Sequence, residues 1–90
     1  MSYEVKGYSH WPAWAVPFLQ ALIRTADDGH LRPGIAADLV GRSRLTPYWY
    51  RRNHPEFDAQ WSEIAVYVRA VAQCAIQRRV NRYEKESELA

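Results

Sequence analysis

The sequence predicts an all-α protein: a small helix-turn-helix domain of three short helices followed by a long C-terminal helix. Apolar residues recur at steps of three and four along most of the chain, which is the period of amphipathic helices. Gly and Pro interrupt this pattern at intervals that suit short helices. With 90 residues, of which 48% are hydrophobic, the chain has room for one compact core.

We expect a single domain over residues 1–90. An irregular arm without clear periodicity covers residues 1–11, a helix-turn-helix core covers 12–54, and a long helix covers 55–86. Because a core of this size is marginal, self-association is a plausible way to supplement it. The single Cys74 cannot form an internal disulfide.

The first helix is expected to begin near Pro17. Apolar residues at Trp14, Phe18 and Leu22 follow the helical period. A proline in the first turn of a helix gives up only an N–H group that would be unpaired in any case. The Asp-Asp-Gly run that ends at Gly29 supplies a stop, since glycine readily takes the left-handed conformation that ends many helices.

A second, short helix is expected from about Arg32 to Val40. Pro33 suits its first turn, and Ile35 lies on its apolar side. Gly41 follows as its C-terminal stop.

The third helix has two alternative starts. Ser43 gives the shorter turn after the second helix, whereas Thr46 followed by Pro47 is the better local start, and either hydroxyl can cap the helix. The helix must end near Asn53, because Pro55 disfavours helical geometry in the residue before it.

The long C-terminal helix carries a heptad-like seam. Its apolar residues alternate steps of four and three, at Phe57, Trp61, Ile64, Val68, Val71 and Ala75. Beyond this point the stripe shifts by one residue, to Ile76, Val80 and Tyr83. Such a seam needs a partner helix, so we expect an oligomer interface at Trp61, Ile64, Val68 and Val71.

Charge is distributed unevenly although the net charge is only +2. The stretch between Leu39 and Pro55 contains four arginines and no carboxylate. Ten of the twelve cations in the chain are Arg, whose guanidinium can pair bidentately with phosphate or guanine. This basic stretch is therefore a candidate contact surface for DNA.

A short helix, a glycine turn and a basic aromatic helix form the layout in which the second helix enters the major groove. The candidate DNA-binding residues are Arg42, Ser43, Arg44, Thr46, Tyr48, Trp49, Arg51 and Arg52. If the helix begins at Ser43, Arg44 is placed to read base edges, whereas a start at Thr46 moves it into the turn as a phosphate contact.

Several of these residues have an alternative interpretation. Arg51 and Arg52 suit phosphate contacts, as does Arg42, but the first two also suit a solvated helix end where cations favour the dipole. Of the consecutive aromatic residues, Tyr50 is expected to face the core. A second basic group on the last helix, at Arg78, Arg79 and Arg82, is either a further DNA surface or a solvated helix end.

One run of residues around the turn stands out: Gly41, Arg42, Ser43, Thr46, Tyr48, Tyr50, His54, Pro55, Glu56 and Phe57. The run resembles the helix-turn-helix of phage terminase small subunits and related phage DNA-binding proteins. Their pattern is a glycine turn, Ser and Thr at the recognition-helix start, a Tyr, an aromatic two residues on, and then Asp-Pro-Glu-Phe. Gly29 with Leu31 is similar to the family's Gly-Asn-Val entry into the helix pair.

The resemblance covers about Phe18 to Trp61 and has three departures. The span between Gly29 and Gly41 is slightly longer than usual, Pro47 replaces an ordinary helix former, and Tyr50 stands where Trp is usual. The resemblance implies binding of double-stranded DNA by a phage or prophage protein in the bacterial cytoplasm, possible phage protein partners, and a role in packaging. A phage transcriptional regulator or an excisionase-like factor is the alternative.

Other classes of function find little support in the sequence. His10, His30 and His54 lack ligand spacing, so we expect no metal and no cofactor. No nucleophile and base are arranged in a triad-like order, so we expect no enzymatic activity. The N-terminus lacks a secretory signal, and no apolar run reaches the length of a membrane span. The remaining alternative is a protein-interaction module acting through the long C-terminal helix.

Overall fold

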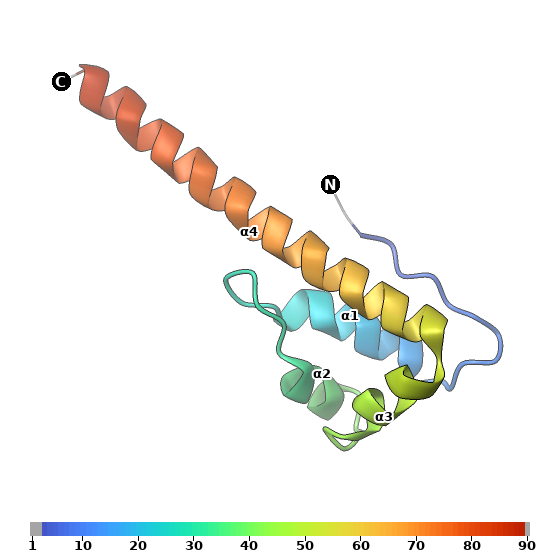
Figure 1. Ribbon diagram of the computed structural model, residues 1–90. Coiled ribbons are helices and arrows are strands. Elements are labelled where there is room, and N and C mark those ends of the chain that lie inside the picture. The colour runs from blue at the N-terminus through green and yellow to red at the C-terminus, as the bar shows by residue number, and fades with distance from the viewer. Residues whose placement is uncertain (1–2, 90) are drawn as a thin grey trace.

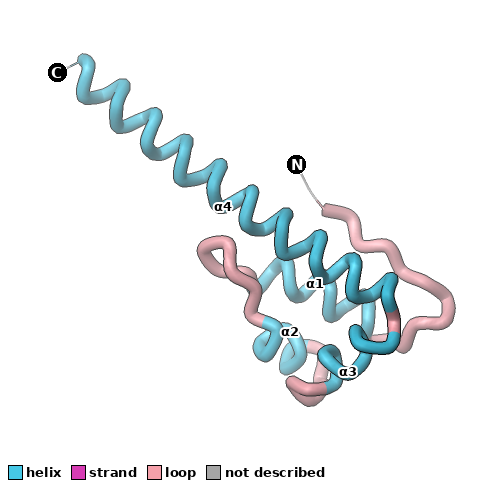
Figure 2. Tube along the Cα trace, in the orientation of Figure 1, coloured by secondary structure: helices cyan, strands magenta, loops and turns pink. Residues whose placement is uncertain are grey.

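The computed structural model describes the backbone of residues 3–89 and the side chains of residues 3–75. It confirms an all-α fold, with no β-strand in the described backbone (Figures 1 and 2). The helices are α1 (Ala15–Thr25), α2 (Pro33–Leu39), α3 (Thr46–Asn53) and α4 (Pro55–Leu89). Helix α1 packs against both α2 and α4, and α3 packs against α4.

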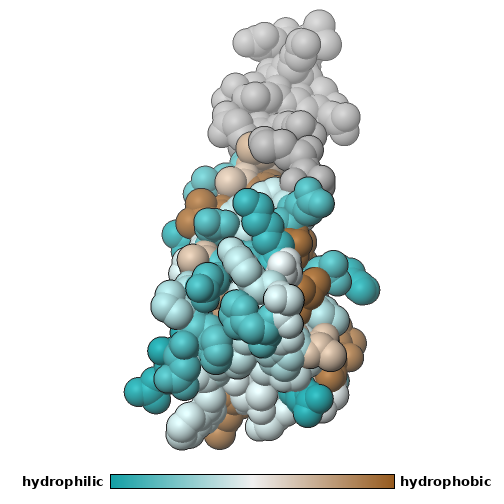
Figure 3. Space-filling model, turned by 90° about the vertical axis from the view of Figure 1, so that its right-hand side faces the viewer, coloured by the Kyte–Doolittle hydropathy of each residue, from teal (hydrophilic) through white to brown (hydrophobic). Residues whose placement is uncertain are grey.

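The molecule consists of a head and a projecting helix. We define the head as residues 3–70, which contain α1, α2, α3 and the proximal half of α4. The rest of α4 runs on beyond the head as a single helix (Figure 1), so the Cα trace measures 58 × 21 × 17 Å. The face seen in Figure 3 is largely hydrophilic, with hydrophobic side chains in separate patches. No helix in the described part of the chain is both long and apolar enough to cross a bilayer.

Helix α1 begins two residues before the expected Pro17, at Ala15. Pro17 still lies in its first turn, where a missing N–H costs nothing. The helix ends at Thr25, and Gly29 has the expected left-handed conformation, with φ +82°, four residues further on. There it forms a two-residue turn, closed by reciprocal backbone hydrogen bonds of 2.9 Å between Asp27 and His30.

Helix α2 ends as the sequence predicts. Gly41 has φ +70°, and its N–H donates to the carbonyl of Asp38 at 3.1 Å. The N–H of Arg42 donates to the carbonyl of Ala37 at 3.0 Å. This is the Schellman arrangement that satisfies the last carbonyls of a helix. It also turns the chain sharply toward α3.

The seam of α4 has its partner within the same chain. Trp61, Ile64 and Val68 are buried in one core with α1 residues such as Phe18 and Leu22. The expectation that these three α4 residues form an oligomer interface is therefore wrong, because the fold has already buried them. The fourth expected interface residue, Val71, lies beyond the cover of α1 and is 46% exposed.

The N-terminal arm is irregular, as expected, but it is held against the head. The carboxamide of the buried Gln60 accepts a hydrogen bond from the backbone N–H of Lys6 at 2.9 Å and donates one to its carbonyl at 2.6 Å. The hydroxyl of Tyr3 donates to Glu63 at 2.8 Å. Trp11, at the end of the arm, belongs to the core.

Candidate nucleic-acid interface

Helix α3 begins at Thr46, the later of the two expected starts, and ends at Asn53 as predicted. Pro47 lies in its first turn. No side chain caps the helix, so the expectation of a Ser or Thr cap is wrong. Ser43 instead forms a local turn, in which its hydroxyl accepts a hydrogen bond from the backbone N–H of Leu45 at 3.3 Å.

The inward face of α3 joins an aromatic cluster centred on Phe57. The ring of Tyr50 meets the edges of Trp14 and Phe57, with centroid separations of 5.3 and 5.0 Å. The prediction that Tyr50 faces the core is confirmed, since it packs partly buried against the core residues. Burial raises the pKa of its hydroxyl above the ordinary value, and the charge of Glu56 adds to this shift.

Arg51 also turns toward the head. Its Nε and one terminal nitrogen lie 2.7 and 2.6 Å from the same carboxylate oxygen of Asp58. The guanidinium carbon lies 4.2 Å from the ring centroid of Trp61, which is cation–π distance. Neither expected position, a phosphate contact or a solvated helix end, matches this arrangement. Arg51 instead clamps α3 to α4.

The outward face of α3 carries the remaining candidates. Trp49 and Arg52 are exposed, with 62% of Trp49 open to solvent. Tyr48 is exposed on one side only, because its ring packs against Trp61 of α4 with a centroid separation of 5.2 Å. Asn53 is exposed as well, and its amide donates a hydrogen bond to the carbonyl of Trp49 at 3.3 Å. Thr46 is partly buried at the start of this face.

The turn before α3 adds two exposed arginines. Arg42 lies directly after Gly41, and Arg44 lies two residues before α3 begins. The side chain of Arg44 reaches back over α2, where it passes Gly34 and comes within 3.6 Å of an Asp38 carboxylate oxygen. Both partners of this pair are exposed, so the pairing is weak and readily exchanged.

Two exposed leucines flank this basic turn, and the sequence did not predict that they lie on the surface beside it. Leu39 and Leu45 are 65% and 64% exposed. With Trp49 they border two shallow hollows on either side of Trp14. Leu39 and Ile35 were expected on the apolar side of the second helix, but the structure leaves both exposed and buries Ala36 and Ala37 there instead.

The formal charge of this region is strongly one-sided. Residues 29–54 contain five arginines and one carboxylate, Asp38, and one of the arginines, Arg32, is paired with Asp27 just before this range. Asp58 at the start of α4 lies close to this region, but its charge is paired with Arg51. Net positive charge thus accumulates at the turn and the outward face of α3, where it raises the local concentration of a polyanion.

Other expected candidates lie elsewhere. The ring of His54 stacks on that of Tyr50 with a centroid separation of 3.7 Å, and its centroid lies 6.4 Å from that of His10. His30 lies in the turn after α1. No cluster of three His, Cys, Asp or Glu able to hold a metal ion occurs among the described residues. The side chains of Arg78, Arg79 and Arg82 lie outside the described residues.

No protein-family model, curated protein or solved structure matches this chain.

Proposed function

We propose that this chain binds double-stranded DNA as a helix-turn-helix protein, with α3 and the turn before it as the contact surface. The observation that carries this proposal is the exposure of Arg42, Arg44 and Arg52 around the outward face of α3. Exposed guanidinium groups can pair bidentately with phosphate, so three of them around one helix suit the DNA backbone.

The geometry of α3 divides the contacts by role. Since α3 begins at Thr46, Arg44 lies in the turn and is assigned to phosphate, together with Arg42 and Arg52. Trp49 projects from the first turn of α3, the part of a recognition helix that reaches deepest into the groove, and Tyr48 lies beside it with one side of its ring on Trp61 and the other open. They are the candidates for contacts with base edges, including the methyl group of thymine.

The biological role rests on the resemblance to phage terminase small subunits. It favours a phage or prophage protein that acts in DNA packaging inside the bacterial cell. A phage transcriptional regulator or an excisionase-like factor would use the same surface, so these roles share the proposed chemistry. Protein interaction through α4 does not compete with DNA binding, because the projecting part of α4 is a separate surface.

A titration of fluorescently labelled duplex DNA at low salt tests the proposal by anisotropy. We expect binding by the natural protein and a loss of at least about tenfold in affinity for the triple variant R42A/R44A/R52A. Arg69→Ala is the matched control, because it removes an exposed arginine from α4, and we expect its affinity to stay within about twofold.

Circular dichroism spectra should show that the triple variant keeps its helices, because its three side chains are exposed. If the natural protein shows no affinity for duplex DNA even at low salt, the proposed function is wrong. It is also wrong if a folded triple variant binds as tightly as the natural protein.

A further inference from the structure

The surface around Trp14 combines exposed apolar side chains with positive charge. Leu39, Leu45 and Trp49 are all mostly exposed, although they come from three successive segments, namely α2, the turn and α3. Large apolar side chains that gather on one exposed surface mark a contact with a partner. The DNA phosphates that we assign to the arginines do not explain the two leucines, because phosphates offer no apolar contact.

Two adjoining hollows share Trp14 in their linings. The first lies between the start of α1 and the end of α2, and Leu39 and Arg42 line it together with Trp14. The second lies between Trp14 and α3, and its lining includes Leu45 and Trp49. We call the two hollows together the Trp14 surface. Two neighbouring apolar hollows suit two apolar side chains that project from the same face of a partner helix.

The charge at the Trp14 surface favours an acidic partner. Arg42 lies in the lining of one hollow, and none of the described residues in either lining carries a carboxylate. Arg52 is exposed three residues after Trp49, so the two side chains are neighbours on the surface of α3. Asp38, the one carboxylate of residues 29–54, already faces Arg44 at 3.6 Å. A carboxylate beside the apolar side chains of a partner would therefore meet guanidinium groups.

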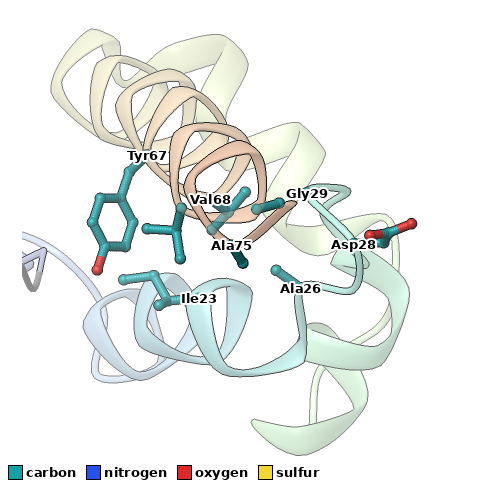
Figure 4. A pocket seen from close by; sticks show the side chains of 9 residues that line it. Ile23, Ala26, Asp28, Gly29, Tyr67, Val68 and Ala75 are labelled. Carbon is teal, nitrogen blue, oxygen red and sulfur yellow. The ribbon is translucent and has the colours of Figure 1, made fainter. Parts of the chain in front are cut away.

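The hollow between α1 and α4 has a different charge. In Figure 4, Ile23 and Ala26 lie on one side of it and Val68 and Ala75 of α4 on the other. Asp28 is the one charged residue among the described residues that line it. An acidic ligand would meet a like charge there, so this hollow provides the comparison for the Trp14 surface.

We infer that the Trp14 surface binds an acidic amphipathic helix of a protein partner. The apolar face of that helix fills the two hollows, and its carboxylates lie beside Arg42 and Arg52. A second copy of this chain fits the surface less well. A symmetric contact would bring the arginines of one copy against the same arginines of the other, and like charges repel.

The Trp14 surface overlaps the proposed DNA surface. Arg42 and Trp49 belong to both, so the acidic helix and duplex DNA exclude one another. A partner of this kind therefore releases the protein from DNA. This competition rests on the proposed function, whereas the binding of the acidic helix does not.

A synthetic helical peptide tests the binding. The probe carries leucines at steps of three and four along one face, with glutamate and glutamine at the other positions. One control peptide has the same composition in scrambled order, and the other has lysine in place of glutamate. Tryptophan fluorescence of the full chain reports binding, because Trp14 and Trp49 line the surface. We expect both controls to bind at least about tenfold more weakly than the probe. No binding by the probe, or equal binding by all three peptides, overturns the inference.

Variants of the chain locate the binding surface. L39S/L45S should weaken binding of the probe by at least about tenfold, because it removes the apolar border of both hollows. V66S/V71S is the matched control, since it removes two exposed apolar side chains of α4, one of them in the hollow of Figure 4, and should leave probe binding unchanged. Equal binding of the probe by L39S/L45S and the natural protein overturns the inference. A dimer of the natural protein that L39S/L45S converts to monomer in sedimentation equilibrium also overturns it, because a second copy then occupies the surface.

The competition is measured by adding the probe to the complex with labelled duplex DNA. We expect the probe to displace the DNA, and L39S/L45S to keep its DNA affinity within about twofold, since neither leucine is assigned to DNA. Simultaneous binding of probe and DNA would show that the two surfaces are separate and overturn the competition. If the natural protein binds the probe but no DNA, the proposed function is wrong and the acidic helix remains the ligand of the Trp14 surface.

Discussion

The guanidinium of Arg51 and the carboxylate of Asp58 join α3 to the first turns of α4, with two nitrogens of Arg51 within 2.7 Å of one oxygen of Asp58. Trp61 lies beneath the same guanidinium. Arg51 is thus separated in role from its neighbour Arg52, which points outward from the same helix. This difference decides which of two adjacent arginines is available to DNA.

Arg51→Ala should therefore act on stability. We expect it to lower the free energy of unfolding by about 1–2 kcal/mol, from the lost ion pair and cation–π contact at a partly exposed site. Urea denaturation followed by tryptophan fluorescence measures this change. Arg52→Ala is the control, since its side chain is exposed, and it should change stability by less than about 0.5 kcal/mol. Equal losses for the two variants would contradict the assignment.

Tyr50→Phe should leave stability unchanged or raise it by up to about 1 kcal/mol. The Tyr50 hydroxyl is one of two buried side-chain polar atoms in the described part of the chain that have no hydrogen-bond partner. Removing it deletes an unsatisfied group while keeping the ring that packs on Trp14 and Phe57. Thermal unfolding measures the effect. A clear loss of stability would show that the hydroxyl has a partner in solution.

The sequence predicted the local features of the fold well, because they depend on residues close together in the chain. Gly41 ends α2, and Pro55 limits α3 to Asn53, as expected from backbone conformation alone. The start of α3 stayed open because Ser43 and Thr46 offer similar local chemistry. The packing of Pro47, which is fully buried, accompanies the later start.

The errors concern contacts between segments that lie far apart in the chain. A heptad seam specifies that a partner helix exists without specifying which one, and here α1 covers Trp61, Ile64 and Val68. Arg51 resembles any cation near a helix end until Asp58 of the next helix is placed beside it. The sequence did not predict that the arm packs against the head. The backbone of Lys6 is held by the side chain of Gln60, a residue far away in the chain, and such a contact leaves no periodic pattern in the arm.

Gln60→Ala should loosen the arm around Lys6, while Tyr3 and Trp11 still hold its two ends. The substitution removes both hydrogen bonds to the Lys6 backbone, which at a partly buried site should cost about 1–2 kcal/mol. Hydrogen exchange of the Lys6 amide, followed by NMR, reports this locally and should become faster by about tenfold or more. The exposed Gln73, which lies further along the same helix, provides the control Gln73→Ala. Unchanged protection at Lys6 would contradict the proposed attachment.

Stability should fall in alkaline solution because of Tyr3. Burial, the hydrogen bond to Glu63 and the charge of Glu63 raise the pKa of Tyr3 from 10 to about 12. A raised pKa means that the folded protein holds this proton more tightly than the unfolded chain. The resulting stability is fully present below pH 10 and is lost as the pH rises toward 12.

Melting temperatures measured between pH 9 and about 12 test this effect of Tyr3. Tyr3→Phe should make the decline shallower, since phenylalanine has no proton to lose. Tyr8→Phe is the matched control, because it removes an exposed tyrosine of the same arm. If Tyr3→Phe and the natural protein decline in parallel, the Tyr3 proton does not contribute in this range.

The central claim, that Arg42, Arg44 and Arg52 bind DNA phosphates, is tested most directly by the salt dependence of duplex DNA binding. Each phosphate contact contributes a slope of about −0.9 to log K plotted against log salt concentration. We expect the slope of the triple variant R42A/R44A/R52A to be shallower than that of the natural protein by about 2.7. Parallel slopes for the two proteins, or no binding by the natural protein at low salt, would contradict the claim.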